Sequence, residues 1–195
     1  MCKINKGLAE QADKYLIGCK NWGFDAYDNI VYAQISYDVE GFCVKFTIKE
    51  SNPLRNMTQH FDLVDKDSCV EFFVNFMPEQ TEAYFNLEVN ALGKMNASFG
   101  LPGNGRTRLK LEEVESFDIT SMIGENEWTV HYKIGYDFIR NYYPEFDIRN
   151  CKYVKGNLYK CASWSDTPHY LSYFKVDSAE KNFHNPKFYG KFVLE

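Results

Sequence analysis

The sequence lacks several features that would place it quickly in a class of proteins. No segment approaches the roughly 20 apolar residues of a membrane span, and the first residues contain no apolar core of a secretory signal. The missing signal predicts a cytoplasmic protein, or an extracellular or periplasmic one if the chain is a processed form. Lys and Arg form no cluster, and the net charge is −5. We therefore expect neither nucleic acid nor an anionic membrane surface as a partner.

The cysteines show no close pairing of the kind that binds metals, such as CxxC. Their even number permits disulfides, but a chain of 195 residues does not need them, so we expect free thiols in a reducing compartment. We expect no cofactor and no transition metal, while Asp62, Asp65 and Asp67 leave calcium open as a ligand. The cysteines are Cys2, Cys19, Cys43, Cys69, Cys151 and Cys161.

Aromatic residues are abundant, at 17% of the chain, and they favour strands. Strand-like stretches recur with turn signals between them, and only residues 137–143, before Pro144, have the pattern of a short helix. This pattern predicts a single domain over residues 1–195, an all-β antiparallel β-sandwich of jelly-roll type with one or two short helices. The expected strands lie within residues 29–38, 42–50, 68–76, 84–100, 127–136, 157–164, 170–176 and 188–195.

Two of these stretches combine an apolar face with a polar one. In "KDSCVEFFVNF" and "YFNLEVN" every second residue is apolar, while Glu71, Asn86, Glu88 and Asn90 fall on the other face. If the strands pair, Glu71 lies beside one of the other three. Such carboxylates and amides suit the hydroxyls of a neutral sugar, and the alternative is the solvated side of an antiparallel sheet.

Four segments, in their order along the chain, resemble a known family. They are "KDSCVEFFVNF", "YFNLEVNALG", "GNLYKCASWSDTPHYLSYF" and "NPKFYGKFVLE", and together with the "NW" near the start they resemble the family 9-like carbohydrate-binding modules over almost the whole chain. The resemblance implies a β-sandwich that binds a saccharide without cleaving it, in support of polysaccharide or oligosaccharide catabolism. It also implies that Glu71 hydrogen-bonds the sugar.

The resemblance further implies that two aromatic side chains enclose the terminal sugar. One of them is often a Trp six residues before the matched Glu, and here that position holds Asp65. The second position holds Tyr173, whose ring can stack on a sugar. An Asp cannot stack, so the missing half of this clamp is expected from Trp164, Phe99 or Tyr170.

Several other residues are weighed as ligand contacts. Arg106 and Arg108 lie in the Gly-rich loop 101–108, from which they could reach a ligand over the sheet; the alternative is that this loop is simply solvated. For Lys160, the sequence does not decide which face of its strand the side chain occupies. Trp22 is expected in the core, and His169 is expected to orient a loop. No residue is predicted to be catalytic. The predicted ligand-binding residues are Glu71, Asn86, Glu88, Asn90, Arg106, Arg108, Lys160, Trp164 and Tyr173.

Two alternatives to sugar binding stay open, as does the oligomeric state. The first is a glycoside-acting enzyme that uses Glu71 and Glu88, which close carboxylates in a deep pocket would favour. Asp67 and Glu71 cannot form such a pair, because four strand residues separate them by about 13 Å, whereas glycosidases hold their carboxyl groups at roughly 5 to 9.5 Å. The second is a structural or interaction domain, which a flat polar face without exposed aromatic rings would favour.

Overall fold

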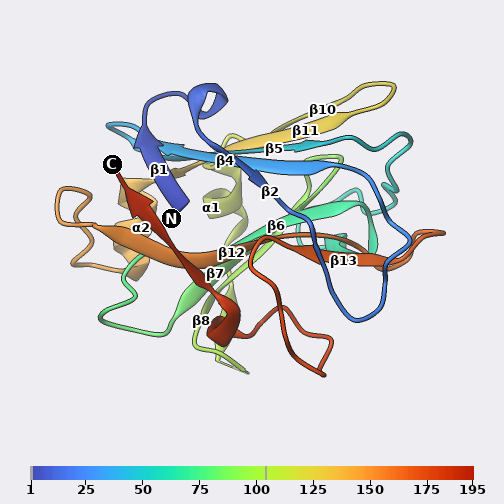
Figure 1. Ribbon diagram of the computed structural model, residues 1–195. Helices are drawn as coiled ribbons and strands as arrows, with labels where there is room; N and C mark the ends of the chain where they lie inside the picture. Colours follow the sequence, from blue (N-terminus) through green and yellow to red (C-terminus); the bar gives the residue numbers. More distant parts are fainter. Residues whose placement is uncertain (1, 104) are drawn as a thin grey trace.

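The computed structural model describes residues 2–103 and 105–195, and its strands form one curled sheet folded into two layers (Figure 1). The first layer contains, in spatial order, β10 (Thr120–Ile123), β11 (Trp128–Gly135), β5 (Gly41–Ile48) and β4 (Val31–Tyr37), with β2 (Lys14–Leu16) also paired to β4. The second contains β14 (Gly190–Leu194), β12 (Tyr153–Ala162), β6 (Cys69–Asn75), β7 (Tyr84–Asn90), β8 (Met95–Gly100) and β9 (Arg106–Arg108).

Short elements complete the two layers. Strand β13 (His169–Ser172) pairs with β12 and with β3 (Cys19–Lys20). The α-helices are α1 (Leu111–Glu115) and α2 (Tyr136–Tyr142), and the 3₁₀ turns are Ala9–Gln11, Val64–Lys66 and Pro186–Phe188. None of the described helices has the length and apolar character needed to cross a membrane.

The two ends of the chain join the layers. Strand β1 (Cys2–Lys6) runs parallel to β14 on one side and to β4 on the other, and Figure 1 shows the termini close together. The predicted antiparallel sandwich with short helices is confirmed, apart from these two parallel pairings. Local alternation carries no signal for them, because the register pairs Cys2 with Phe192 across nearly the whole sequence.

Most local predictions are confirmed as well. The hairpin within residues 29–50 forms as β4 and β5, and residues 136–142 form α2 directly before the turn at Pro144. The loop 101–108 differs from its prediction, because Arg106–Arg108 pair with β8 as an edge strand. Residue 104 of that loop lies outside the described residues.

Both faces of the central strands β6 and β7 are buried. Their apolar face packs between the layers, as the alternation predicts, through Val70, Phe72, Val74 and the corresponding residues of β7. The polar face is covered too, because residues 176–189 fold over it and form a second apolar cluster around Phe73. The carboxylates of this face are therefore enclosed by protein and do not lie on an open wet surface.

The register of the hairpin β6–β7 is set at its turn. Asn75 donates from Nδ2 to the carbonyl oxygen of Thr81 at 2.6 Å, and its Oδ1 accepts from the backbone N–H of Met77 at 2.8 Å. These bonds fix the ends of the two strands, and the ladder then places Glu71 directly opposite Glu88. A slip of either strand by one residue would move the carboxylate of that strand to the interior face.

Gly156 allows β12 to approach β6 closely. A Cβ at this position would lie 2.2 Å from the carbonyl oxygen of Phe73, which is held in the sheet. We expect Gly156→Ala to lower the free energy of unfolding by about 3 kcal/mol, because the clash is with backbone. Urea unfolding measures this, with the exposed Gly18→Ala as the control that changes stability by less than about 0.5 kcal/mol. Equal stabilities of the two variants would contradict the close approach.

Candidate functional site

A cleft of about 310 Å³ opens on the covered outer face of the second layer, and we call it the outer cleft. Its floor is the sheet itself, through side chains of β6, β7, β8 and β12. These floor residues are Glu71, Phe73, Glu88, Asn96 and Cys161. Its rim comes from loops and from β13, namely Trp22, Asp65, Tyr170, Lys181, Phe183 and His184.

Two carboxylates lie side by side in the floor. Glu71 and Glu88 are cross-strand partners and are only 3% and 6% exposed. Both oxygens of Glu88 accept amide hydrogens, from Asn86 at 2.9 Å and from Asn96 at 3.0 Å. Glu71 accepts from the thiol of Cys161 through Oε1 at 3.0 Å. The amides thus hold Glu88 in one orientation, whereas the other oxygen of Glu71 accepts no hydrogen bond from residues 2–103 and 105–195.

Burial makes the charged forms of this pair costly. It raises the pKa of Glu71 well above its usual value, and the nearby Cys161 and Glu88 raise it further. Burial also raises the pKa of Glu88 to about 7, although the amide of Asn96 opposes the shift. At neutral pH the floor therefore carries protonated as well as charged carboxyl groups, which can donate and accept hydrogen bonds.

Aromatic rings form one side of the rim. The Trp22 ring lies 5.6 Å from that of Tyr170 and 5.1 Å from that of Phe183, measured between centroids. The Nε1 of Trp22 donates to the carbonyl oxygen of Ser178 at 2.8 Å, so the loop that carries Trp22 is bonded to the segment that covers the sheet. Trp22 was expected in the core, and it does pack on the second apolar cluster, but it also lines the outer cleft.

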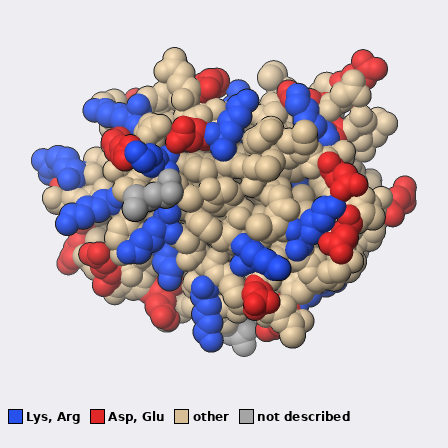
Figure 2. All heavy atoms as spheres, viewed as in Figure 1, with Lys and Arg blue, Asp and Glu red and all other residues tan. Residues whose placement is uncertain are grey.

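Acidic side chains outnumber basic ones around the outer cleft. Lys181 is the one cation among the described lining residues, and its Nζ lies 4.8 Å from the ring centroid of Tyr170. Asp65, Glu71 and Glu88 oppose it. Over the face seen in Figure 2, cationic and anionic side chains are interspersed. This arrangement favours a neutral ligand in the cleft over an anionic one.

Asn86 and Asn90, both predicted as ligand contacts, orient other protein groups. Asn86 supports Glu88 from outside the cleft, and its Oδ1 is buried without a hydrogen-bond partner among the described residues. Asn90 donates to Asp67 at 3.0 Å and to the carbonyl oxygen of Met57 at 2.8 Å. It therefore fastens the loop before β6 to the end of β7.

The three aspartates considered for calcium are held apart by other partners. Asp67 accepts from the backbone N–H groups of residues 56 and 57, Asp62 accepts from that of Gln59, and Asp65 pairs with Lys66. In the described part of the chain these carboxylates do not converge into a set of metal ligands.

The two arginines lie at different distances from the outer cleft. The guanidinium of Arg106 contacts the Tyr84 hydroxyl and the ring nitrogen Nδ1 of His184, a rim residue. Burial and this guanidinium lower the pKa of His184 to about 3, so the ring is neutral. Arg106 thus stands behind the rim, while Arg108 lies over the ring of Phe61 at 5.3 Å and lines another hollow.

The structure does not bring Tyr173, Trp164 or Phe99 to the outer cleft. Tyr173 faces the opposite side from Tyr170 and packs against Phe192 between the layers, as alternation over three residues requires. Trp164 is 62% exposed and lines a separate cleft of about 530 Å³. Phe99 packs on the core. The aromatic side of the cleft comes from Trp22 and Tyr170 instead.

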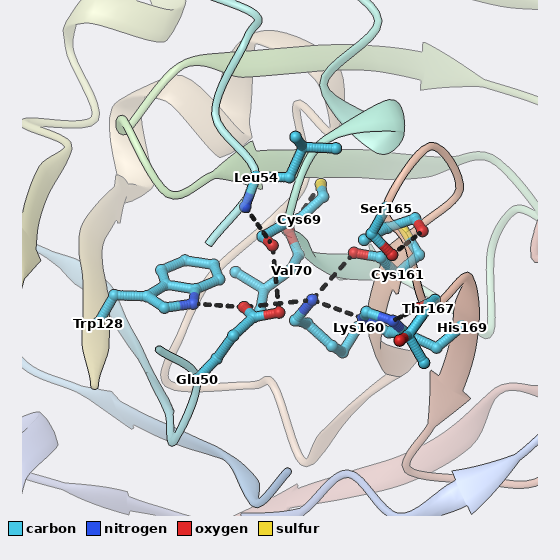
Figure 3. Close-up of polar contacts among 12 residues, drawn as sticks. Glu50, Leu54, Cys69, Val70, Trp128, Lys160, Cys161, Ser165, Thr167 and His169 are labelled. Atoms are coloured by element: carbon cyan, nitrogen blue, oxygen red, sulfur yellow. Dashed lines mark hydrogen bonds and ion pairs between the residues drawn. The ribbon is translucent and has the colours of Figure 1, made fainter. Parts of the chain in front are cut away.

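Lys160 lies between the two layers, on the opposite face of β12 from Cys161 (Figure 3). It is 0% exposed, and its Nζ donates to the carbonyl oxygen of Cys161 at 3.1 Å and to His169 Nε2 at 2.7 Å. The other ring nitrogen of His169 donates to the carbonyl oxygen of Thr167 at 2.8 Å, which is the predicted loop-orienting bond. Lys160 therefore cannot contact a ligand in the outer cleft.

Glu50 supplies the negative charge opposite Lys160. Its Oε2 lies 3.6 Å from the ammonium and accepts from Trp128 Nε1 at 2.7 Å, while its Oε1 accepts from the Ser68 hydroxyl at 3.2 Å. Figure 3 shows Glu50, Trp128 and Lys160 converging from different parts of the chain. Burial lowers the pKa of Lys160, and Glu50 opposes that shift. The polar contacts of Glu50 with Lys160, Trp128 and Ser68 thereby link the two layers.

Sequence reasoning missed several cleft residues. Asn96 could have been found, because the hairpin β7–β8 places it opposite Glu88. Lys181, Phe183 and His184 carry no such signal, since the segment that covers the sheet has no regular period. Cys161 was expected only as a buried thiol.

Comparisons with known proteins agree on one family. The family model for carbohydrate-binding family 9 matches residues 6–194. No curated protein sequence matches the chain. A structure of a Bacteroides uniformis protein, provisionally described as carbohydrate-binding, is similar with a TM-score of 0.82 and 20% identity, covering 100% of this chain and 98% of that one.

Structures of a family 9 carbohydrate-binding module from Caldicellulosiruptor kristjanssonii are also similar. The complex with glucose has a TM-score of 0.69 and 10% identity, covering 99% of this chain and 94% of that one. The complex with cellotriose has the same TM-score and identity, covering 100% and 93%. At these identities the likeness concerns the fold.

We expect Lys160→Met to lower the free energy of unfolding by about 3 kcal/mol, because it leaves Glu50 buried without its cation. Denaturant unfolding at neutral pH measures the loss. The matched control is Lys155→Met, a partly buried position on the same strand with no recorded carboxylate partner among the described residues, for which we expect a small change. Equal effects of the two variants would contradict the role of Lys160 as a structural cation.

Proposed function

Because the chain belongs to carbohydrate-binding family 9, whose function is non-catalytic carbohydrate binding, we propose that the outer cleft is where this protein holds its saccharide. The observation that carries the proposal is the paired carboxyl groups of Glu71 and Glu88, fixed in the floor beside an aromatic rim. The position that the family resemblance assigns to the sugar-binding Glu is Glu71. The free oxygen of this residue is the group that we assign to a sugar hydroxyl.

The chemistry of the cleft matches a neutral sugar. Carboxyl and amide groups in the floor can both accept and donate hydrogen bonds to hydroxyls, and the rim of Trp22 and Tyr170 offers apolar rings to the C–H face of a pyranose. Asp65 occupies the rim where a stacking ring would be expected from the resemblance. We therefore assign stacking to one side of the sugar, and hydrogen bonding to the other.

Glucose and short β-glucans are the first ligands to test. The Caldicellulosiruptor module was solved with glucose and with cellotriose, and the outer cleft of this chain, at about 310 Å³, is of a size for the end of a sugar chain. By binding the end of a sugar chain, the protein would support polysaccharide or oligosaccharide catabolism carried out by other proteins.

The enzymatic alternative is less well supported by the geometry. Glu71 and Glu88 are close, but both extend from the same face of one sheet, as direct cross-strand partners. Glycosidases place their two carboxyl groups on either side of the scissile bond. We therefore expect sugar to leave the cleft uncleaved. The aromatic rim also distinguishes the site from the flat polar face expected of a purely structural domain.

We expect Glu71→Ala to weaken saccharide binding by about 1.5–3 kcal/mol, because it removes a hydrogen bond to a carboxyl group. Calorimetric titration with glucose and cellotriose measures the change, and a thermal unfolding curve shows that the variant is folded. Glu112→Ala, on the exposed surface of α1, is the control that keeps its affinity. An affinity unchanged by Glu71→Ala would move the site away from this sheet, and wild-type protein that binds no sugar at millimolar concentration would refute the proposal.

The rim makes a second prediction about stacking. Tyr170→Ala should weaken saccharide binding by about 1 kcal/mol through the loss of ring contact. Trp164→Ala should leave the affinity unchanged, because that exposed ring lines another cleft. The same titrations test both variants, and the opposite order of effects would assign the sugar to the cleft at Trp164.

A further inference from the structure

Two cysteines that are far apart in the sequence face each other beneath the outer cleft. Cys69 of β6 and Cys161 of β12 are directly opposite in the antiparallel ladder, and both are free and buried. Cβ atoms of such partners lie about 4.5–5.5 Å apart. The register therefore holds two sulfur atoms together on the outer side of the sheet, although the sequence shows no CxxC motif.

Glu71 adds a third ligand atom to this pair. One ligand atom each of Cys69, Glu71 and Cys161 lies within 4.8 Å of the other two. Zn–S bonds are about 2.3 Å and Zn–O bonds about 2.0–2.2 Å long, so one ion between the three atoms would need only small side-chain shifts. In residues 2–103 and 105–195, no other group of His, Cys, Asp or Glu side chains converges in this way.

We propose that Cys69, Cys161 and Glu71 bind a thiophilic divalent metal ion, of which Zn²⁺ is the representative, in the floor of the outer cleft. Two thiolates select a soft or borderline ion over calcium or magnesium. On binding, each thiol, and Glu71 where it is protonated, loses its proton to solvent, and the divalent ion compensates two of the three negative charges that result.

The surroundings fit a cation better than they fit the bare ligands. Cys69, Glu71 and Cys161 are each at most 3% exposed, so thiolate and carboxylate charges here are costly until a cation compensates them. The ammonium of Lys160 does not supply that charge, because it lies on the other face of β12 and is bonded there to His169. The site thus has three ligands of the right kind and a deficit of positive charge.

A fourth coordination position would face the cleft. Glu71 and Cys161 both line it, so solvent or a ligand can reach an ion held between them. Three protein ligands can hold zinc with water in the fourth position, as catalytic zinc sites show, whereas structural sites use four protein ligands. The metal would also draw Glu71 away from a sugar, and this coupling rests on the proposed function.

Cobalt titration of the reduced full-length chain tests the metal site without any sugar. We expect one Co²⁺ per chain with thiolate-to-cobalt charge-transfer absorption, which Zn²⁺ then displaces. Cys69→Ser and Cys161→Ser should each weaken binding by more than the roughly 10- to 100-fold typical of losing a supporting partner. Cys43→Ser, a partly buried thiol in the other layer, is the matched control and should bind as the wild type does.

Alkylation of the intact wild-type chain provides a test that needs no variant to fold. Zn²⁺ should slow the modification of Cys69 and Cys161, located by peptide mass spectrometry, and leave that of Cys43 unchanged. Absence of the charge-transfer band, a band that survives both serine variants, equal protection of all thiols, or a Cys69–Cys161 disulfide that persists under reductant would each overturn the metal site.

A sugar titration with and without Zn²⁺ tests the coupling. We expect Zn²⁺ to lower saccharide affinity about 5-fold or more, since Glu71 is shared, which corresponds to about 1 kcal/mol. Equal affinities would overturn the coupling. A protein that binds cobalt through both cysteines but binds no sugar would refute the proposed function and leave the metal site standing, so the two failures can be told apart.

Discussion

The register of β6 with its two neighbours is the constraint on which the site depends. Pairing with β7 sets Glu71 against Glu88, and pairing with β12 sets Cys69 against Cys161. Because side chains alternate along a strand, the same register sends the apolar residues of β6 into the core. The turn bonds of Asn75 hold it in place. One ladder thus produces the core, the carboxyl pair and the thiol pair together.

The covering segment turns this sheet face into a chemically distinct site. Residues 176–189 remove the floor of the outer cleft from water, and the pKa of Glu88 rises to about 7 in consequence. A solvated sheet face would leave both carboxylates charged and hydrated. Enclosure instead gives carboxyl groups that can both donate hydrogen bonds to sugar hydroxyls and accept them, and the aromatic rim adds apolar contact.

The opposite face of β12 shows the same burial with a different outcome. There Lys160 is matched by Glu50 and His169, so the buried charge has partners and serves to join the layers. Alternation by a single residue separates this structural cation from the floor of the cleft, where Cys161 lies. The sequence could not decide between these faces for Lys160, since both neighbours of this residue in the strand are compatible with either.

The sequence by itself determined the strands and their two faces, because alternation and turn signals act over a few residues, and it limited the partner of Glu71 to three residues if the two strands pair. The recurring strands predicted a sandwich, and the family resemblance implied the same fold. Only the tertiary structure decided that Trp22 and Tyr170 form the rim while Tyr173 and Trp164 lie elsewhere, and that Cys69 meets Cys161. Those contacts join segments far apart in the chain, and they depend on sheet register and loop closure, which leave no periodic pattern in the sequence.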